Sequence, residues 1–196
     1  MISSFDTLQP IYKGNNSLIY YQEKSDYGFP VVIKMFPTPV PTLKQLSYFK
    51  NEYEIVKDAN IQGIRKAIGQ VKIEETDALI LEYVEGEAIS SILNKTSIPI
   101  EDCLKIGISV SQTLGEIHQH QIIHRDINNN NILVDTNSLT TTIIDFGISS
   151  RIDVKMPHLG NLDTLEGTLA YISPEQTGRM NRVVDYRTDL YSLGVS

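Results

Sequence analysis

The chain has 196 residues, with 17 Lys and Arg against 24 Asp and Glu, so its formal net charge is −7. Its 41% hydrophobic and 21% charged residues are typical of a globular protein and exclude wholesale disorder. The acidic balance argues against binding nucleic acid or anionic lipid through bulk charge, and we expect no nucleic-acid partner. A single cysteine, Cys103, excludes an internal disulfide framework.

The N-terminal segment and the apolar runs indicate where in the cell the protein is located. The opening MISSFDTLQP lacks the basic stretch and apolar run that are typical of a secretory signal. No apolar run approaches the ~20 residues that span a bilayer. We therefore expect a soluble cytoplasmic protein with no membrane span, in one domain or two small lobes.

The first 84 residues are predicted to form an antiparallel sheet with one helix. Residues 43–57 predict an amphipathic helix, because apolar residues recur there at helical spacing. β-branched and aromatic residues predict strands at 17–22, 30–36, 67–75 and 77–84.

Residues 85–196 are predicted to be mainly helical, which makes the fold class α+β. The polar segment 85–91 is interpreted as a connection, and the period of the apolar residues at 101–120 predicts a helix. Cys103 is expected to be a small core residue of that helix, and His118 a surface residue. Further elements are predicted as a hairpin at 131–135 and 141–147, a long loop at 148–166, and a helix from Asp185.

Three sequence blocks carry the chemistry because their order and spacing agree. His124-Arg125-Asp126 is followed, five residues after the aspartate, by Asn131. Asp145-Phe146-Gly147 begins 14 residues after that asparagine. The third block is Gly167-Thr168, then Tyr171, then Ser173-Pro174-Glu175. Each triplet alone is weak, but together they form the signature set of one enzyme class.

With these blocks, residues 10–196 resemble the eukaryotic-type Ser/Thr protein-kinase domain. The resemblance implies a two-lobed fold, with residues 1–84 as the N-lobe and residues 85–196 as a partial C-lobe cut off within a helix. It also implies transfer of the γ-phosphoryl group of MgATP to Ser or Thr hydroxyls of a protein substrate, with ATP and Mg²⁺ as cofactors.

The resemblance gives each motif residue a role. Asp126 would be the catalytic base, and Asn131 and Asp145 would hold Mg²⁺, which prefers oxygen ligands. Lys34, in the strand VVIK, would meet the nucleotide phosphates and pair with Glu52 of the following helix. The residues that would contact the nucleotide are Gly14, Ile19, Val32, Lys34, Glu82, Val84, Asn131, Leu133 and Asp145.

The later part of the chain gives the resemblance further detail. Asp189 would accept hydrogen bonds that fix His124 and Arg125, and Thr164 would occupy the activation-loop phosphosite, facing Arg125. Glu175 is expected to lack the arginine that normally pairs with it, and apolar side chains at 185–196 are expected to be uncovered. The stretch 167–195 looks like the kinase domain of large hybrid signalling proteins, which implies sensor, ATPase and histidine-kinase modules as further partners.

Three departures from the kinase pattern leave other functions open. The glycine-rich loop keeps only Gly14, Val32 replaces an alanine, and Asn128 replaces a lysine that contacts the γ-phosphate. These features are compatible with a pseudokinase that binds ATP with little turnover. A small-molecule phosphotransferase shares the lysine, the Asp-x-x-x-x-Asn spacing and the metal aspartate, but lacks Phe146-Gly147 and the 167–175 block. A purely structural lobe would have little reason to place Asp126, Asn131 and Asp145 around one point.

Overall fold

The computed structural model describes residues 9–14, 17–38, 40–73, 76–152, 166–178 and 182–196. The chain divides into two units. The first unit consists of Met1–Ala59 and Arg65–Val84, and the second of Asn60–Ile64 and Glu85–Ser196.

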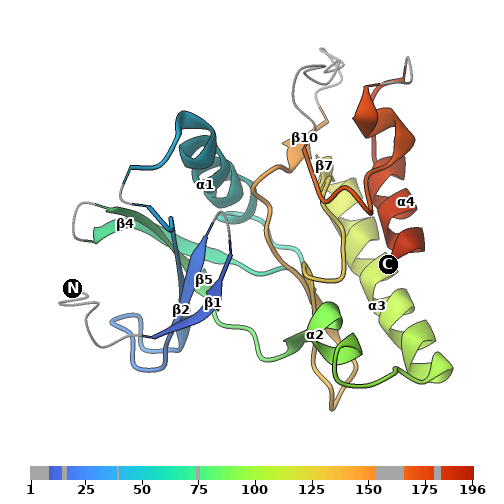
Figure 1. Cartoon of the computed structure of the whole chain (residues 1–196), viewed down its shortest axis with the longest axis horizontal. Coiled ribbons are helices and arrows are strands. Elements are labelled where there is room, and N and C mark those ends of the chain that lie inside the picture. The colour runs from blue at the N-terminus through green and yellow to red at the C-terminus, as the bar shows by residue number, and fades with distance from the viewer. Residues whose placement is uncertain (1–8, 15–16, 39, 74–75, 153–165, 179–181) are drawn as a thin grey trace. The chain divides into compact units, whose positions relative to one another are not determined.

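The first unit is an antiparallel sheet with one helix, as Figure 1 shows. Its strands follow the spatial order β1-β2-β3-β5-β4. They are β1 (Pro10–Lys13), β2 (Leu18–Gln22), β3 (Val31–Met35), β4 (Ala67–Ile73) and β5 (Thr76–Glu82). The four strands predicted from the sequence are therefore confirmed, with small differences at their ends.

The central strand β3 is buried on both faces of the sheet. Val31 and Ile33 pack on one face with Ile80 of the neighbouring strand. Val32 and Lys34 alternate with them and therefore lie on the other face, and both are also buried. A lysine thus stands in the middle of an apolar strand, which requires a charged partner.

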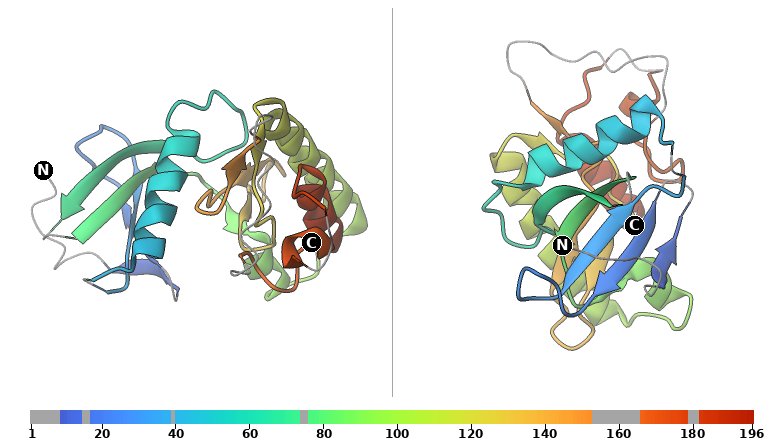
Figure 2. Two further views of the ribbon diagram at one scale, coloured as in Figure 1. Left: turned by 90° about the horizontal axis from the view of Figure 1, so that it is seen from above. Right: turned by 90° about the vertical axis from the view of Figure 1, so that its left-hand side faces the viewer.

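Helix α1 (Leu43–Val56) lies along one face of this sheet, as the two views of Figure 2 show. Its start is fixed by a capping box, in which the Thr42 hydroxyl accepts from the Gln45 amide and the Gln45 side chain accepts from the Thr42 amide. Phe49 stacks on Phe36 with ring centroids 3.9 Å apart. The capping box and this packing hold the helix that the sequence predicts.

The second unit is built on helices with short strand pairs. Helices α3 and α4 lie side by side in Figures 1 and 2, and the sheet pairs are β6-β8-β9 and β10-β7. The elements are β6 (Glu87–Ala88), α2 (Ile89–Leu93), α3 (Ile100–Gln119), β7 (Ile122–Ile123), β8 (Ile132–Val134), β9 (Thr141–Ile143), β10 (Ser150–Arg151), the 3-10 turn Pro174–Thr177 and α4 (Arg187–Val195). The α+β class, the predicted hairpin and the two predicted helices are confirmed.

The segment 85–91 is more regular than the sequence predicts. Glu87 and Ala88 pair antiparallel with Val134 and Leu133 of the hairpin, and helix α2 begins at once at Ile89. The two residues of this strand are only half-buried, so a polar sequence is tolerated there. Interpreting the segment as a plain connection was therefore wrong.

Helix α3 buries one of its two apolar stripes. Ile106, Val110, Leu114 and Ile117 are buried, whereas Cys103, Leu104 and Ile108 are exposed. The prediction that Cys103 is a core residue was wrong, because Cys103 belongs to the exposed side of the helix. No helix in the described parts of the chain is long and apolar enough to cross a membrane.

Residues 60–64 join the second unit through the backbone. Gly63 accepts a hydrogen bond from the Ile143 amide at 2.8 Å, and the Gln62 amide donates to the Glu116 carboxylate at 3.1 Å. Gly63 has φ +79°, and a Cβ added there would lie 2.3 Å from the Thr113 hydroxyl. Only glycine fits this position, because a side chain would meet both backbone strain and a clash.

We expect Gly63→Ala to lower the free energy of unfolding by more than the ~1–2 kcal/mol of left-handed backbone strain alone. The matched control is Gly115→Ala in α3, where an added Cβ meets nothing within 4 Å. That change should raise stability by about 0.5–1 kcal/mol through helix propensity. Urea unfolding followed by circular dichroism measures both, and equal effects would contradict the packing described for Gly63.

Candidate functional site

Lys34 and Glu52 form a buried ion pair in the first unit. The Lys34 ammonium Nζ lies 2.7 Å from the Glu52 carboxylate Oε2, and the side chains are only 9% and 4% exposed. The ammonium also lies 5.7 Å from the centre of the Phe49 ring. α1 thus provides the carboxylate that a lysine in the middle of β3 requires, and removing either partner would leave an uncompensated buried charge.

The other predicted nucleotide residues of the first unit lie on its strands and turns. Ile19 is paired with Lys34 across β2 and β3, and Val32 is paired with Leu81 of β5. Cross-strand partners share a face, so Ile19, Val32 and Lys34 lie on one face of the sheet.

The ends of these strands carry the remaining three predicted residues. Gly14 closes the turn after β1, where its amide donates to the Ser17 carbonyl at 2.9 Å. Glu82 ends β5, with its amide donating to the Lys66 carbonyl, and Val84 is half-buried two residues later.

Asp126 and Asn131 are in direct contact in the second unit. The Asn131 amide nitrogen Nδ2 donates to the Asp126 carboxylate Oδ2 at 3.0 Å and to the Asp126 carbonyl at 2.9 Å. Oδ1 of Asp126 accepts from the Thr168 amide at 2.9 Å and the Thr168 hydroxyl at 2.8 Å. Both carboxylate oxygens are therefore held by fixed donors.

Burial raises the pKa of the Asp126 carboxyl above the ordinary aspartate value. The hydrogen bonds from Thr168 act in the opposite direction, and the neighbouring charge of Asp145 adds to the rise. A carboxylate with a raised pKa is a better proton acceptor, which suits a general base.

Asp145 follows β9 in a strained conformation, with φ +66°. Its Oδ1 accepts from the Gly147 amide at 3.4 Å. Phe146 is buried and meets the His124 ring edge-on at 4.7 Å. Left-handed backbone at a non-glycine residue is typical of functional loops.

The oxygens of Asn131 and Asp145 fit Mg²⁺, which proteins bind through one or two such ligands plus substrate phosphates. Asn131 makes its two hydrogen bonds with nitrogen, so its carbonyl oxygen would be the atom that binds a metal. In the described residues there is no cluster of three or more His, Cys, Asp or Glu. Leu133, the last predicted nucleotide residue, lies on β8 and is buried.

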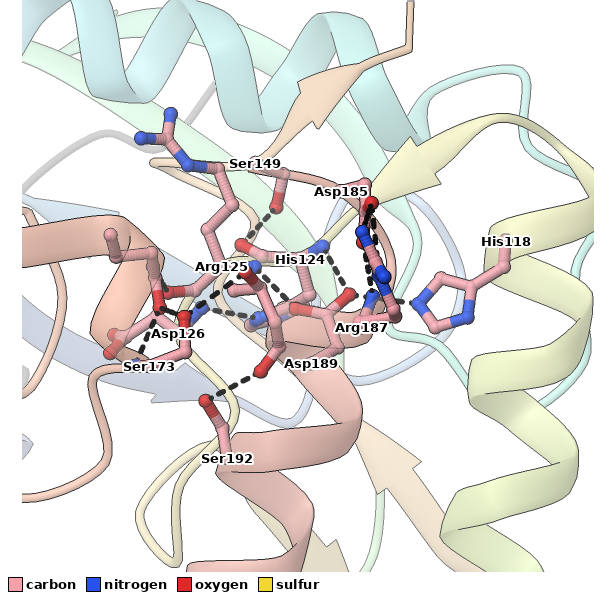
Figure 3. A network of polar contacts seen from close by, with 12 residues as sticks. His118, His124, Arg125, Asp126, Ser149, Ser173, Asp185, Arg187, Asp189 and Ser192 are labelled. Carbon is pink, nitrogen blue, oxygen red and sulfur yellow. Dashed lines mark hydrogen bonds and ion pairs between the residues drawn. The ribbon is translucent and has the colours of Figure 1, made fainter. Parts of the chain in front are cut away.

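Asp189, on α4, anchors the backbone of the loop that carries His124, Arg125 and Asp126 (Figure 3). Its buried carboxylate accepts from the His124 amide at 2.9 Å and from the Arg125 amide at 2.7 Å. The predicted contacts of Asp189 are confirmed. The Nε2 atom of His118 lies 2.9 Å from the same carboxylate, so the prediction that His118 is a surface residue was wrong. α3 places it there because the last turn of the helix faces α4 (Figure 3).

His124 is a buried structural residue of the same loop. Its Nε2 lies 3.1 Å from the Ile144 carbonyl, and its Nδ1 accepts from the Asp126 amide at 3.3 Å. A carbonyl can only accept and an amide can only donate, so the tautomer with the proton on Nε2 satisfies both contacts. The ring thus ties the Asp126 backbone to the residue before Asp145.

Arg125 has φ +70°, and its carbonyl accepts from the Gln176 side chain at 2.8 Å. Its guanidinium Nη1 lies 3.8 Å from the Glu166 carboxylate. Thr164, the predicted phosphosite, lies outside the described residues. Glu166 is an acidic neighbour of Arg125 that motif matching did not single out.

Glu175 accepts from the Thr188 hydroxyl at 2.8 Å, and Thr188 is in turn bonded to Ser173 at 3.1 Å. A hydroxyl of α4 therefore meets the Glu175 carboxylate, where the family pattern has an arginine. The expected uncovered apolar side chains of the last helix are observed: Tyr186, Leu190, Tyr191 and Val195 are exposed.

The chain is similar to protein kinases along its length. The sequence profile of the family described as "Protein kinase domain" matches residues 5–196. A probable serine/threonine-protein kinase of Clostridium perfringens is 29% identical over 193 residues, covering 97% of this chain and 27% of that protein. Wall-associated receptor kinase 1 of Arabidopsis thaliana is 34% identical over 160 residues, covering 77% of this chain and 21% of that protein. The chain thus spans about a quarter of the length of these relatives.

We expect Asp189→Asn to lower the free energy of unfolding of the second unit by roughly 1–3 kcal/mol, because one buried backbone N–H then faces an NH₂ group. The matched control is Asp185→Asn, four residues earlier, whose carboxylate pairs with exposed Arg187. That change should cost less than about 1 kcal/mol. Urea unfolding compares the two, and a neutral Asp189→Asn would refute the anchoring role.

Proposed function

Because the chain belongs to the protein kinase domain family, we propose that it transfers the γ-phosphoryl group of MgATP to Ser or Thr hydroxyls of a protein substrate in signal transduction. The observation that carries this proposal is the half-buried Asp126 carboxylate, held on both oxygens by Thr168 and Asn131. A base positioned in this way is a requirement of hydroxyl activation.

In this proposal residues 1–84 are the N-lobe, which contains the whole first unit and binds the nucleotide. Lys34 meets the phosphates as a cation that Glu52 keeps in a fixed rotamer. The face of the sheet that carries Ile19 and Val32 supplies apolar contact to adenine, Glu82 and Val84 supply backbone hydrogen bonds, and Gly14 lets the backbone approach the phosphates.

Residues 85–196 act as the C-lobe and carry out the proton transfer. Asp126 accepts the proton of the substrate hydroxyl while the oxygen of that hydroxyl attacks the γ-phosphorus, and the bond to the β-phosphate oxygen breaks. Asn131 and Asp145 hold Mg²⁺, which when bound neutralises charge on the phosphates. Leu133 contributes apolar contact to the nucleotide.

A second candidate is a pseudokinase that binds ATP with little turnover. Asn128 favours it, because no cation stands two residues after Asp126 to neutralise the transferring phosphoryl group. The relatives described above are named serine/threonine-protein or receptor kinases, which supports the catalytic reading.

The protein context is also a proposal. We propose a cytoplasmic kinase accompanied by sensor, ATPase and histidine-kinase modules, on the likeness of residues 167–195 to hybrid signalling proteins. The part of each relative that matches this chain is only 27% and 21% of its length, so these proteins contain further sequence outside the match.

We expect ATP to bind in a Mg²⁺-dependent way, and Asp145→Asn to abolish that dependence because a metal ligand is lost. Asp126→Asn should keep ATP binding and lose transfer by about 100-fold or more, because the proton acceptor is removed. Asp102→Asn, on the surface of α3, is the matched control and should change neither. Calorimetry of ATP binding and radiolabelled phosphate transfer measure the two steps.

The measurements of ATP binding and phosphate transfer distinguish the active kinase from the pseudokinase. Binding without transfer in the unmodified protein would favour the pseudokinase. The absence of both binding and transfer would overturn both proposals.

We expect the acidic limb of the pH profile of kcat/KM to lie above the ordinary aspartate pKa of about 3.9, because burial raises the pKa of Asp126. The base form is then lost at a higher pH as the solution is acidified. Thr168→Val removes a hydrogen bond that lowers this pKa, so the limb should move further upward. Thr168→Ser keeps the hydroxyl and is the control. An unmoved limb in Thr168→Val would contradict this assignment.

A further inference from the structure

We propose that Asn128 is a positioning residue, which holds the Asp126 carboxylate in place through Thr168 and takes no part in binding phosphate. This inference rests on the proposed phosphoryl transfer. Asn128 stands where the kinase pattern has a lysine that contacts the γ-phosphate, and we assign it a positioning role in place of phosphate binding.

Asn128 is 1% exposed, and both polar atoms of its side chain are hydrogen-bonded. Its Nδ2 donates to the Asp126 carbonyl at 3.0 Å and to the Thr168 hydroxyl at 3.1 Å. Its Oδ1 accepts from the Asn130 amide at 2.8 Å. A side-chain amide has two N–H donors, and both are used here, so none remains for a phosphate oxygen.

These contacts also fix the direction of the Thr168 hydroxyl. The backbone N–H of Asn130 can only donate, so the atom of Asn128 that faces it is the oxygen, and the nitrogen faces Thr168. An amide nitrogen can only donate, so the Thr168 oxygen accepts from Asn128 and its own proton points to Asp126 Oδ1, 2.8 Å away.

The result is a one-way chain of hydrogen bonds from an amide to a hydroxyl to a carboxylate. Each bond in such a chain polarises the next, which strengthens the hold on the last acceptor. Asn131 holds the other oxygen of Asp126 at 3.0 Å. The proton acceptor is thus fixed from two sides, which matters because displacement of a reacting group by about 1 Å can cost 100-fold in rate.

A lysine would not reproduce these contacts, because its ammonium cannot accept the hydrogen bond of the Asn130 amide. The surroundings of residue 128 therefore match a side-chain amide. We expect Asn128→Lys to lower the rate of phosphate transfer, although it restores the residue of the family pattern.

The test is a double-mutant cycle of Asn128→Ala and Thr168→Val, with kcat and the KM for ATP measured for each. Each single change should lower kcat about 10-fold or more with the KM for ATP within about twofold. The double variant should be no slower than the slower single variant, because both changes break one chain. Thr168→Ser should restore most of the rate, and Asn130→Ala, an exposed neighbour, should leave it unchanged.

Three results would overturn the inference. One is that the two losses in kcat multiply in the double variant. The second is that Asn128→Ala raises the KM for ATP while kcat stays constant, which would mean phosphate binding. The third is that Asn128→Lys is faster than the unmodified protein. Should Asn128→Ala fail to fold, Asn128→Asp keeps the shape and the acceptor while it removes the donor to Thr168.

A second readout separates this inference from the proposed function. If the unmodified protein transfers no phosphate, the proposed function fails, and the inference is then decided by hydrogen exchange of the Thr168 amide, which donates to Asp126. Asn128→Ala should speed that exchange at least several-fold, whereas Asn130→Ala should not. Unchanged exchange in Asn128→Ala would overturn the inference.

Discussion

The loop that carries His124, Arg125 and Asp126 depends on one buried carboxylate. Asp189 is fully buried, and it binds the backbone amides of His124 and Arg125 as well as the His118 ring. A buried carboxylate is tolerated only when its oxygens are saturated with donors, and these three donors meet that condition. Arg125 holds a left-handed backbone conformation that costs free energy by itself. The hydrogen bond from its amide to Asp189 offsets that cost and keeps Asp126 in its place.

Local patterns predict most of the elements. β3 is recognisable from its β-branched residues, α1 from its apolar spacing, and the β8–β9 hairpin from two apolar runs around a turn. The contacts of Asp189 were available from the family resemblance, since this aspartate has no local signal of its own. Where a residue is defined by its neighbours in sequence, the prediction agrees with the structure.

Residues defined by distant partners were not predictable in the same way. His118 shows nothing in its local sequence of a contact with Asp189, 71 residues later. Cys103 was misplaced because α3 carries two apolar stripes, and periodicity alone does not say which of them meets the core. The sequence alone suggests that Asn128 is a lost cation, whereas its hydrogen bonds to Asp126, Asn130 and the distant Thr168 show an amide in a matched environment.

The separation of Asp189 from the loop that it anchors has a consequence for synthesis. Asp189 lies 65 residues after His124, and ribosomes add about 5–20 residues per second. For roughly 3 to 13 s the nascent chain therefore carries the complete loop sequence without the carboxylate that fixes it. During that interval the amides of His124 and Arg125 lack the carboxylate that binds them in the folded chain. The order of translation thus delays the assembled loop until α4 has emerged, and the β8–β9 hairpin, whose strands are close in sequence, can form before it.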